Sequence, residues 1–324
     1  MKFLSISSLA LIAITLCAAP AAAQAPYPNR AIKILVGIPP GGAPDVVARV
    51  VGQQLSESLG QPVVIENRPG ANGNLAGEAA AKATPDGYTL LLGADSGVVI
   101  NPHVYSHTMQ FDPLKDLIPI TSVATNQFIL AVNPKLPVKA LPDFIDYARK
   151  ANPPLAFAHG GVGSQHQFAM EVFKQRAGIN LFNITYRGGP PAMIATVAGE
   201  TQVLFAGGES AGQFAGGTLR ALAVTGKKRS KGFPDLPTIG EFYPGYEVDI
   251  WLGLFAPAGT PEAIVARLRK DVQTALARPE VAEKINVSGS LEPLILSPED
   301  FSARIRNDYD KFGKLVKEFN IKID

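Results

Sequence analysis

Cysteine is almost absent from this sequence: the single residue of this type, Cys17, lies in an apolar N-terminal segment. Lys2 precedes an apolar run from Phe3 to Ala18, and small residues follow from Ala19 to Ala25. This order is typical of a secretory signal peptide, and we expect cleavage after residue 23 to leave a periplasmic protein. The mature chain would then have no cysteine, which excludes disulfides, a thiol nucleophile and thiolate metal ligands.

An excess of charge of either sign is also absent, since 30 Lys and Arg residues face 28 Asp and Glu residues. This balance gives no indication of nucleic-acid binding or of attraction to an anionic membrane surface. Beyond the N-terminal segment, no apolar run reaches the roughly 20 residues that a membrane-spanning helix needs. We therefore expect a soluble protein, and about 300 mature residues favour two lobes over one.

The stretch from Ile34 to Asp45 reads as a buried strand, a Pro/Gly loop and the first turn of a helix, with Pro44 in that turn. A helix N-terminus presents N–H groups without intrahelical acceptors and the positive end of the helix dipole. Glycine at positions 41 and 42 lets a ligand approach that backbone closely. An anion is therefore expected in front of the strand, although a single loop of this kind is also consistent with an ordinary tight connection.

The same strand–loop–helix design recurs along the chain. The later loops are Ala94–Gly97, His159–Ser164 and Arg187–Pro191. Ser164 and Gln167 have the spacing of a capping box, which predicts a helix that begins at Ser164. Between residues 31 and 93, strands alternate with helices, which predicts a parallel sheet.

Two extended segments are expected to cross between the lobes. Thr121–Val132 leads out of the first lobe, and Trp251–Ala256 leads back into it. Two long amphipathic helices then open at Thr260-Pro261 and Ser297-Pro298, and we expect both to pack on the first lobe.

A set of motifs in fixed order makes the chain similar to the periplasmic substrate-binding proteins of the tripartite tricarboxylate transporter family, often called Bug proteins. The matching segments are Pro40-Gly41-Gly42 with Asp45, Gly60-Gln61-Pro62, Asn67-Arg68-Pro69-Gly70, Pro85-Asp86-Gly87-Tyr88, Gly161-x-Gly163-Ser164, Tyr186-Arg187-Gly188, Leu236-Pro237-Thr238 and Trp251-x-Gly253-Leu254. The match covers nearly the whole mature chain. Two departures are Gly37-Ile38, where an aromatic residue is common, and Gln202, where Asp is common.

The resemblance implies the two-lobed type II periplasmic binding protein fold, an α/β fold of mixed sheets with helices on both faces and two crossing strands as hinge. The expected division is a signal peptide at 1–23, a first lobe at 24–124 and 251–324, and a second lobe at 125–250. The implied ligand-binding residues are Pro40, Gly41, Gly42, Asp45 and Ser96 on the first lobe, and Gly163, Ser164, Tyr186 and Gly188 on the second. His159 joins this set because it opens the third Gly loop, with ordering of its own loop as the alternative.

The function that the resemblance implies is capture of a mono-, di- or tricarboxylate for the membrane subunits of a tripartite tricarboxylate transporter. A ligand sensor that reports to a sensor kinase is the first alternative. We expect a monomer with no cofactor, no metal site and no catalytic residues.

A periplasmic serine hydrolase is the second alternative, because Ser164 lies near His159 and His166 and a serine nucleophile needs a neighbouring base. No Gly-x-Ser-x-Gly elbow surrounds Ser164, however, and a helix N-cap accounts for it equally well. His103 and His107 lie four residues apart, but the sequence around them predicts a loop and lacks the acidic partner of a zinc motif. We expect both to be surface or cleft-rim histidines.

The first βα turn also lacks the Gly-x-Gly-x-x-Gly pattern of a dinucleotide site. Asp45 is unusual so near an anion site, and three roles stay open for it: capping the helix, holding a water, or receiving an amino group of the ligand.

Overall fold

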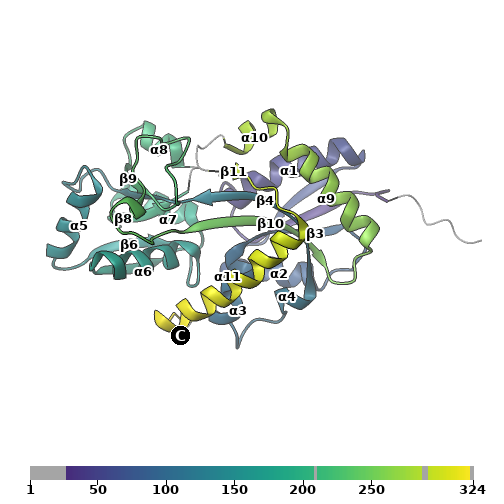
Figure 1. Cartoon of the computed structure of the whole chain (residues 1–324), viewed down its shortest axis with the longest axis horizontal. Helices are drawn as coiled ribbons and strands as arrows, with labels where there is room; N and C mark the ends of the chain where they lie inside the picture. Colours follow the sequence, from purple (N-terminus) through teal and green to yellow (C-terminus); the bar gives the residue numbers. More distant parts are fainter. Residues whose placement is uncertain (1–26, 208–209, 287–290, 322–324) are drawn as a thin grey trace, which may run out of the picture.

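The computed structural model describes residues 27–207, 210–286 and 291–321, so the predicted signal peptide lies outside the described residues. The chain forms two α/β lobes side by side, each built on its own sheet (Figure 1). This arrangement confirms the predicted fold class. None of the described helices is long and apolar enough to cross a membrane.

The sheet of the first lobe has the strand order β11-β4-β10-β3-β1-β2. The strand bounds are β1 Ile32–Val36, β2 Val63–Asn67, β3 Thr89–Ala94, β4 Leu117–Gln127, β10 Asp249–Pro257 and β11 Leu291–Pro293. Parallel pairing of β1 with β2 and with β3 confirms the parallel sheet predicted from the alternating pattern. β10 pairs antiparallel with β3 and β4, so the complete sheet is mixed.

Helices cover both faces of this sheet because its strands are apolar on both sides. In β1, Ile34 and Val36 pack into the cluster under α1 and α9, whereas Leu35 packs into the cluster under α2 and α11. The helix bounds are α1 Ala43–Leu59, α2 Asn74–Ala81, α3 Asn101–Val104, α4 Pro113–Asp116, α9 Glu262–Leu276, α10 Pro279–Ile285 and α11 Pro298–Glu318. Helix α1 ends at Gly60, whose φ of 67° gives the left-handed cap that glycine adopts readily.

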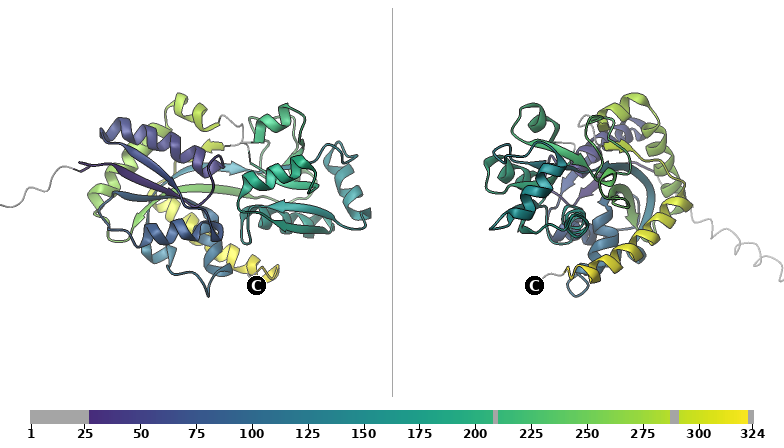
Figure 2. Two further views of the ribbon diagram at one scale, coloured as in Figure 1. Left: turned by 180° about the vertical axis from the view of Figure 1, so that it is seen from behind. Right: turned by 60° about the vertical axis from the view of Figure 1, so that its left-hand side comes forward.

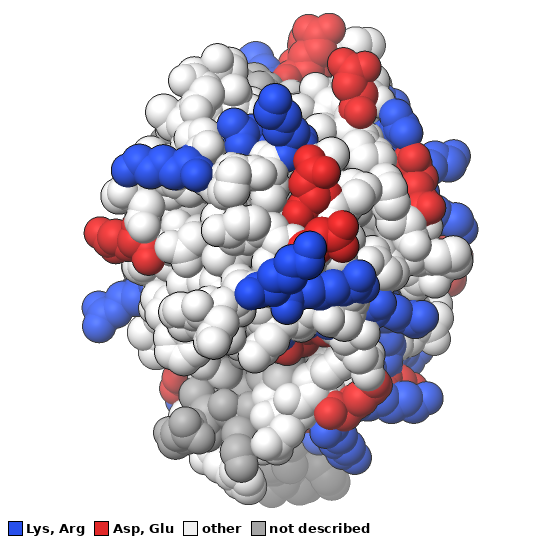
Figure 3. Space-filling view, turned by 90° about the vertical axis from the view of Figure 1, so that its left-hand side faces the viewer, with Lys and Arg blue, Asp and Glu red and all other residues white. Residues whose placement is uncertain are grey.

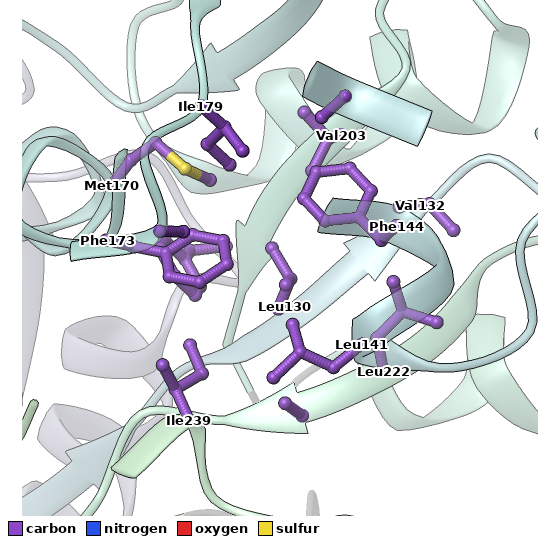
Figure 4. Packing of buried hydrophobic residues seen from close by; sticks show 14 of the residues in the cluster. Leu130, Val132, Leu141, Phe144, Met170, Phe173, Ile179, Val203, Leu222 and Ile239 are labelled. Carbon is purple, nitrogen blue, oxygen red and sulfur yellow. The ribbon is translucent and has the colours of Figure 1, made fainter. Parts of the chain in front are cut away.

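The sheet of the second lobe has the order β7-β6-β8-β5-β9. Its elements are β5 Ile129–Val132, α5 Leu141–Lys150, β6 Leu155–His159, α6 Gln165–Ala177, β7 Leu181–Thr185, α7 Gly189–Ala198, β8 Val203–Ala206, α8 Ala211–Ala215 and β9 Arg220–Val224. Leu130 and Val132 of β5 lie against Phe144 of α5 and Phe173 of α6 in the centre of its core (Figure 4). Each lobe therefore has a core of its own.

The chain changes sheets between Gln127 and Ile129, and returns to the first sheet at Asp249. Thr225 ties the two crossings together, because its Oγ1 accepts from the backbone N–H of Phe128 at 2.9 Å and donates to the carbonyl of Val248 at 2.9 Å. Both crossings therefore pass through one hydrogen-bonded point, which is suited to act as a hinge.

Helix α11 corrects one expectation. It packs on the first lobe through Phe301 and Ile305 as predicted, but its C-terminal half also reaches α6 of the second lobe. The ring of Phe312 meets that of Phe168 edge-on, with the centroids 5.5 Å apart. Gln175 Nε2 donates to Glu318 Oε1 at 2.8 Å, and Figure 2 shows α11 running toward the second lobe. The helix therefore bridges the two lobes.

Short elements account for most other differences from the sequence prediction. The pattern gave no signal for α4, α8, α10 or β11. His103 lies in helix α3 and not in a loop, and its Nε2 lies 2.9 Å from the carbonyl oxygen of Tyr309 in α11. The loop prediction was therefore wrong for His103, which is half-buried in α3 against α11.

We expect Gly253→Ala to lower the stability of the first lobe. A Cβ at Gly253 would lie 2.6 Å from Cζ of Phe301 and 2.9 Å from Cε2 of Phe255, inside a buried aromatic cluster. Overpacking of this kind costs about 1–3 kcal/mol. Thermal and urea denaturation followed by circular dichroism measure the change. Gly212→Ala, whose Cβ meets nothing within 4 Å, is the control, and equal melting temperatures for both variants would contradict the packing.

Candidate functional site

A cavity of about 110 Å³ lies between the lobes and is lined by residues of both. We call it the interlobe cavity. From the first lobe it is lined by Gly37, Ile38, Gly42, Ala43, Pro44, Asn72, Gly73, Gly77, Leu91–Ala94, Ser96–Val98, Phe111, Leu117 and Leu252. Asn126 of β4 and Ile250 of β10 line it from the crossing segments. From the second lobe it is lined by Phe128, Gly160, Ser164–His166 and Gly188–Pro190.

Within the described ranges, four helices of eight or more residues begin at this cavity: α1, α2, α6 and α7. Their N-cap residues are Gly42, Gly73, Ser164 and Gly188, and all four line it. The first-turn N–H groups of a helix lack intrahelical acceptors, and the helix dipole adds partial positive charge there. Two helix termini from each lobe therefore make the cavity favourable for an anion.

Two glycine contacts bring these helix ends close to the strands. A Cβ on Gly37 would lie 2.5 Å from the Cα of Gly73, and a Cβ on Gly160 would lie 3.1 Å from the backbone carbon of Gly188. A side chain at Gly37 or Gly160 would therefore push the N-terminus of α2 or α7 away. At the departure Gly37-Ile38, Gly37 thus makes a close backbone contact, and Ile38 lines the cavity where an aromatic residue is common in the family.

The described residues that line the cavity include no Lys, Arg, Asp or Glu. Asp45 is buried beneath the first loop, where its carboxylate accepts from the Gly41 N–H at 3.0 Å, from Asn67 Nδ2 at 2.9 Å and from Arg49 Nη2 at 2.9 Å. Burial opposes its ionisation, but these hydrogen bonds outweigh burial and lower the pKa of Asp45. Its position shows that Asp45 holds the loop in place from outside the cavity.

The third Gly loop is organised by Ser164 and His159. Ser164 Oγ accepts from the Gln167 N–H at 3.4 Å, which confirms the predicted N-cap. The ring of His159 lies 2.9 Å through Nδ1 from the Gly161 carbonyl oxygen and 3.2 Å through Nε2 from Thr185 Oγ1. Both ring nitrogens of His159 therefore have partners within the second lobe, and neither is directed at Ser164.

The structure brings some of the predicted site residues together at the interlobe cavity and places others around it. Gly42, Ser96, Ser164 and Gly188 line it, and Gly41 lines a smaller adjacent cavity of about 70 Å³. Pro40 is exposed, whereas Asp45, His159, Gly163 and Tyr186 lie behind the cavity wall. No observation here tests which of these residues contact a ligand, so that assignment stays a prediction.

Gly163 and Tyr186 have clear structural partners. The Gly163 carbonyl accepts from Asn72 Nδ2 of the first lobe at 3.1 Å. Burial first, and then the charge of Glu200 and a hydrogen bond with it, raise the pKa of Tyr186. Gln202 lies away from the cavity, where its Oε1 accepts from the Ala156 N–H at 2.8 Å. The departure at Gln202 therefore concerns the second sheet and not the ligand.

Sequence reasoning missed three polar residues that line the cavity, Asn72, Asn126 and Gln165, and named His159 as the ligand-binding histidine where His166 is the one that lines the cavity. The ring of His166 stacks on Phe128, with centroids 4.3 Å apart, and lines both cavities. Burial, with a smaller contribution from His159, lowers the pKa of His166 to about 3, so its ring is neutral at neutral pH. The available signal for Gln165 and His166 was their place directly after the N-cap serine.

The part of the chain that the structure describes contains no cluster of three or more His, Cys, Asp or Glu residues able to hold a metal. His103 and His107 do not form a pair, because His103 contacts α11 and His107 is exposed in the turn that follows α3.

A buried carboxyl group lies behind the Ser96 wall. Asp95 is 1% exposed and accepts from the Ser96 N–H at 2.9 Å. Burial first, and then the charge of Asp308, raise the pKa of Asp95 well above its ordinary value of 3.8. Asp308 itself accepts from the indole N–H of Trp251 at 2.8 Å. Asp95 therefore carries an unfavourable charge if it ionises in the folded protein.

The two lobes, the paired hinge crossings and an uncharged cavity ringed by helix N-termini define a two-lobed binding protein. The family model described as the tripartite tricarboxylate transporter family receptor matches residues 47–321. The chain therefore belongs to the tripartite tricarboxylate transporter receptor family, which confirms the predicted resemblance.

Three relatives illustrate this membership. BugT of Bordetella pertussis is 34% identical over 311 residues, which cover 94% of each chain. The solved structure of R. palustris Rpa4515 with adipate is 33% identical and has a TM-score of 0.88 over 92% of this chain and 100% of its own. MatC of Rhodopseudomonas palustris with bound malate is 28% identical and has a TM-score of 0.81 over 90% of this chain and 100% of its own.

We expect Asp95→Asn to stabilise the protein at neutral pH. A raised pKa means that the folded state holds a proton that the unfolded chain has lost, so the free energy of unfolding falls as pH rises above 3.8. Asparagine removes this titration, and the gain in melting temperature over the parent should therefore be larger at pH 7.5 than at pH 4.5. Asp146→Asn, at an exposed site, is the control. A gain that is the same at both pH values would show that Asp95 does not titrate this way.

Proposed function

We propose that this protein captures a small organic carboxylate in the periplasm and delivers it to the membrane subunits of a tripartite tricarboxylate transporter. One observation carries the proposal: helix N-termini from both lobes surround a cavity that no described charged side chain lines. The structures of Rpa4515 with adipate and of MatC with bound malate support the same ligand class, because both ligands are carboxylates.

The cavity favours a ligand without an ammonium group. An α-amino acid brings a positive charge, which needs an acidic partner or several free acceptors. Asp45 is the acidic residue closest in sequence to the first loop, and Gly41, Arg49 and Asn67 already occupy its oxygens. In this proposal Asp45 holds the first loop through the Gly41 N–H, and of the three roles open for it, reception of an amino group is set aside.

Closure of the lobes about the hinge near Thr225 completes the site in this proposal. The lobes are residues 24–124 with 251–324, and residues 125–250. Hydrogen bonds from Asn72 Nδ2 to the Gly163 carbonyl, at 3.1 Å, and from Tyr105 OH to the Val162 carbonyl, at 2.9 Å, join them beside the cavity. Closing excludes water, and in a water-poor site the N–H groups stabilise an anion more strongly.

The alternatives have less support. A sensor that reports to a kinase would use the same ligand site, and only its membrane partner differs. A serine hydrolase needs a base at Ser164, but both ring nitrogens of His159 have other partners. Nucleic-acid binding gains no support from the end face of the second lobe, where Lys and Arg side chains are interspersed with Asp and Glu (Figure 3).

Thermal-shift measurements against a panel of mono-, di- and tricarboxylates test the ligand class. A ligand at 100 times its dissociation constant stabilises the folded protein by about 2.7 kcal/mol, which raises the melting temperature measurably. We expect at least one carboxylate to do so and the corresponding neutral amides to have no effect. Equal shifts from a carboxylate and its amide would exclude an anion site.

We expect Gly42→Val to weaken carboxylate binding at least tenfold, about 1.4 kcal/mol. A Cβ at Gly42 would lie 2.4 Å from Ile38 Cδ1 and 3.8 Å from Cδ of Pro190 on the opposite lobe, so the new side chain would fill the cavity at the α1 terminus. Isothermal titration calorimetry gives the dissociation constants, and Gly212→Val is the matched control outside the cleft. An unchanged affinity in Gly42→Val would remove the α1 loop from the site.

A further inference from the structure

The side-chain amide of Gln165 is a buried donor that lacks an acceptor. Gln165 is 6% exposed, is the first residue of α6 and lines the interlobe cavity. Its Nε2 atom has no hydrogen-bond partner among the described residues. A buried donor without an acceptor destabilises a protein, so such an atom at a cavity wall indicates a group that binds there.

The side chains of Ser164 and Gln167, on either side of Gln165 in this turn, are already hydrogen-bonded. Ser164 Oγ accepts from the Gln167 N–H, and Gln167 Oε1 accepts from the Gly163 N–H at 2.8 Å. His166 stacks on Phe128 and is neutral. On the opposite wall, Asn72 Nδ2 is shared between Asn101 Oδ1 and the Gly163 carbonyl.

The helix termini alone can satisfy one carboxylate. An ionised carboxylate accepts about four hydrogen bonds. Pro44 in α1 and Pro190 and Pro191 in α7 have no N–H, but the first turns at the cavity keep backbone N–H groups at Ala43, Gln165, His166 and Gly189, which is that number. A further donor at Gln165 therefore exceeds what a single carboxylate needs. A cavity of about 110 Å³ also has room for more of the ligand than one carboxylate group.

We propose that Gln165 Nε2 donates to a second acceptor group of the ligand, and that Gln165 thereby selects dicarboxylates and hydroxy- or oxo-carboxylates over simple monocarboxylates. This inference rests on the proposed function, because it assumes that one carboxylate occupies the helix termini. Gln165 is then a specificity residue of the second lobe, and the helix termini supply the affinity for the first carboxylate.

The test compares pairs of ligands with equal carbon number, butanoate against succinate and hexanoate against adipate, by isothermal titration calorimetry. The parent protein should bind the better dicarboxylate about tenfold more tightly than its monocarboxylate partner. Gln165→Leu should weaken binding of the dicarboxylate by about that factor and leave binding of the monocarboxylate nearly unchanged. The preference for the dicarboxylate would then be lost. Gln165→Glu, which replaces the amide donor by a carboxylate, should weaken binding of the dicarboxylate further.

Gln54→Leu is the matched control. Gln54 is also 6% exposed and also has an amide atom without a partner, Oε1, but it lies on α1 away from the cavity. Its substitution should leave the preference for dicarboxylates intact. Circular dichroism and the melting temperature of each ligand-free variant show that it is folded, and Gln165→Met replaces Gln165→Leu if the latter does not fold.

Two results would overturn the inference and leave the proposed function in place: equal affinity of the parent for both members of each pair, or equal weakening of both members by Gln165→Leu. Failure of every carboxylate to bind the parent would instead overturn the proposed function and the inference with it.

Discussion

The proposed site depends on one constraint: a carboxylate has to be stabilised mainly by backbone N–H groups, because no described Lys or Arg lines the cavity. Backbone donors are short, so the helices that carry them have to approach the ligand without intervening side chains. The contacts of Gly37 with Gly73 and of Gly160 with Gly188 meet this requirement in the two lobes. One such glycine contact occurs in each lobe, and the interlobe cavity lies between the two contacts.

The remaining architecture orders the loops that carry these helix ends and connects the two lobes. Asp45 fixes the first loop through the Gly41 N–H, and His159 fixes the third loop through the Gly161 carbonyl. Thr225 joins the two crossing segments, and α11 bridges from the first lobe to α6 through Phe312. Polar and charged groups near the cleft, such as Asp45 and His159, therefore act on the protein backbone. In the proposed function the backbone in turn binds the ligand, which lets an uncharged cavity select an anion.

The sequence allowed the strand–loop–helix junctions, the crossing segments and the family to be predicted, because glycine, proline and capping residues act locally. The direction of the side chains around the cavity could not be predicted in the same way. His159 and Tyr186 turn away because their partners, Thr185 and Glu200, are brought near them only by the folded second lobe. The one signal for Gln165 was its place directly after the N-cap serine, and a glutamine there is ordinary until the surrounding structure buries it. Short elements such as α10 and β11 depend on tertiary packing for the same reason.

The most direct measurement is a crystal structure of the protein with a carboxylate that stabilises it. The account predicts ligand oxygens within about 3.2 Å of first-turn N–H groups of helices from both lobes, directly or through one ordered water, with no Lys or Arg in contact. A carboxylate held by an Arg or Lys side chain, or bound to one lobe only, would contradict it.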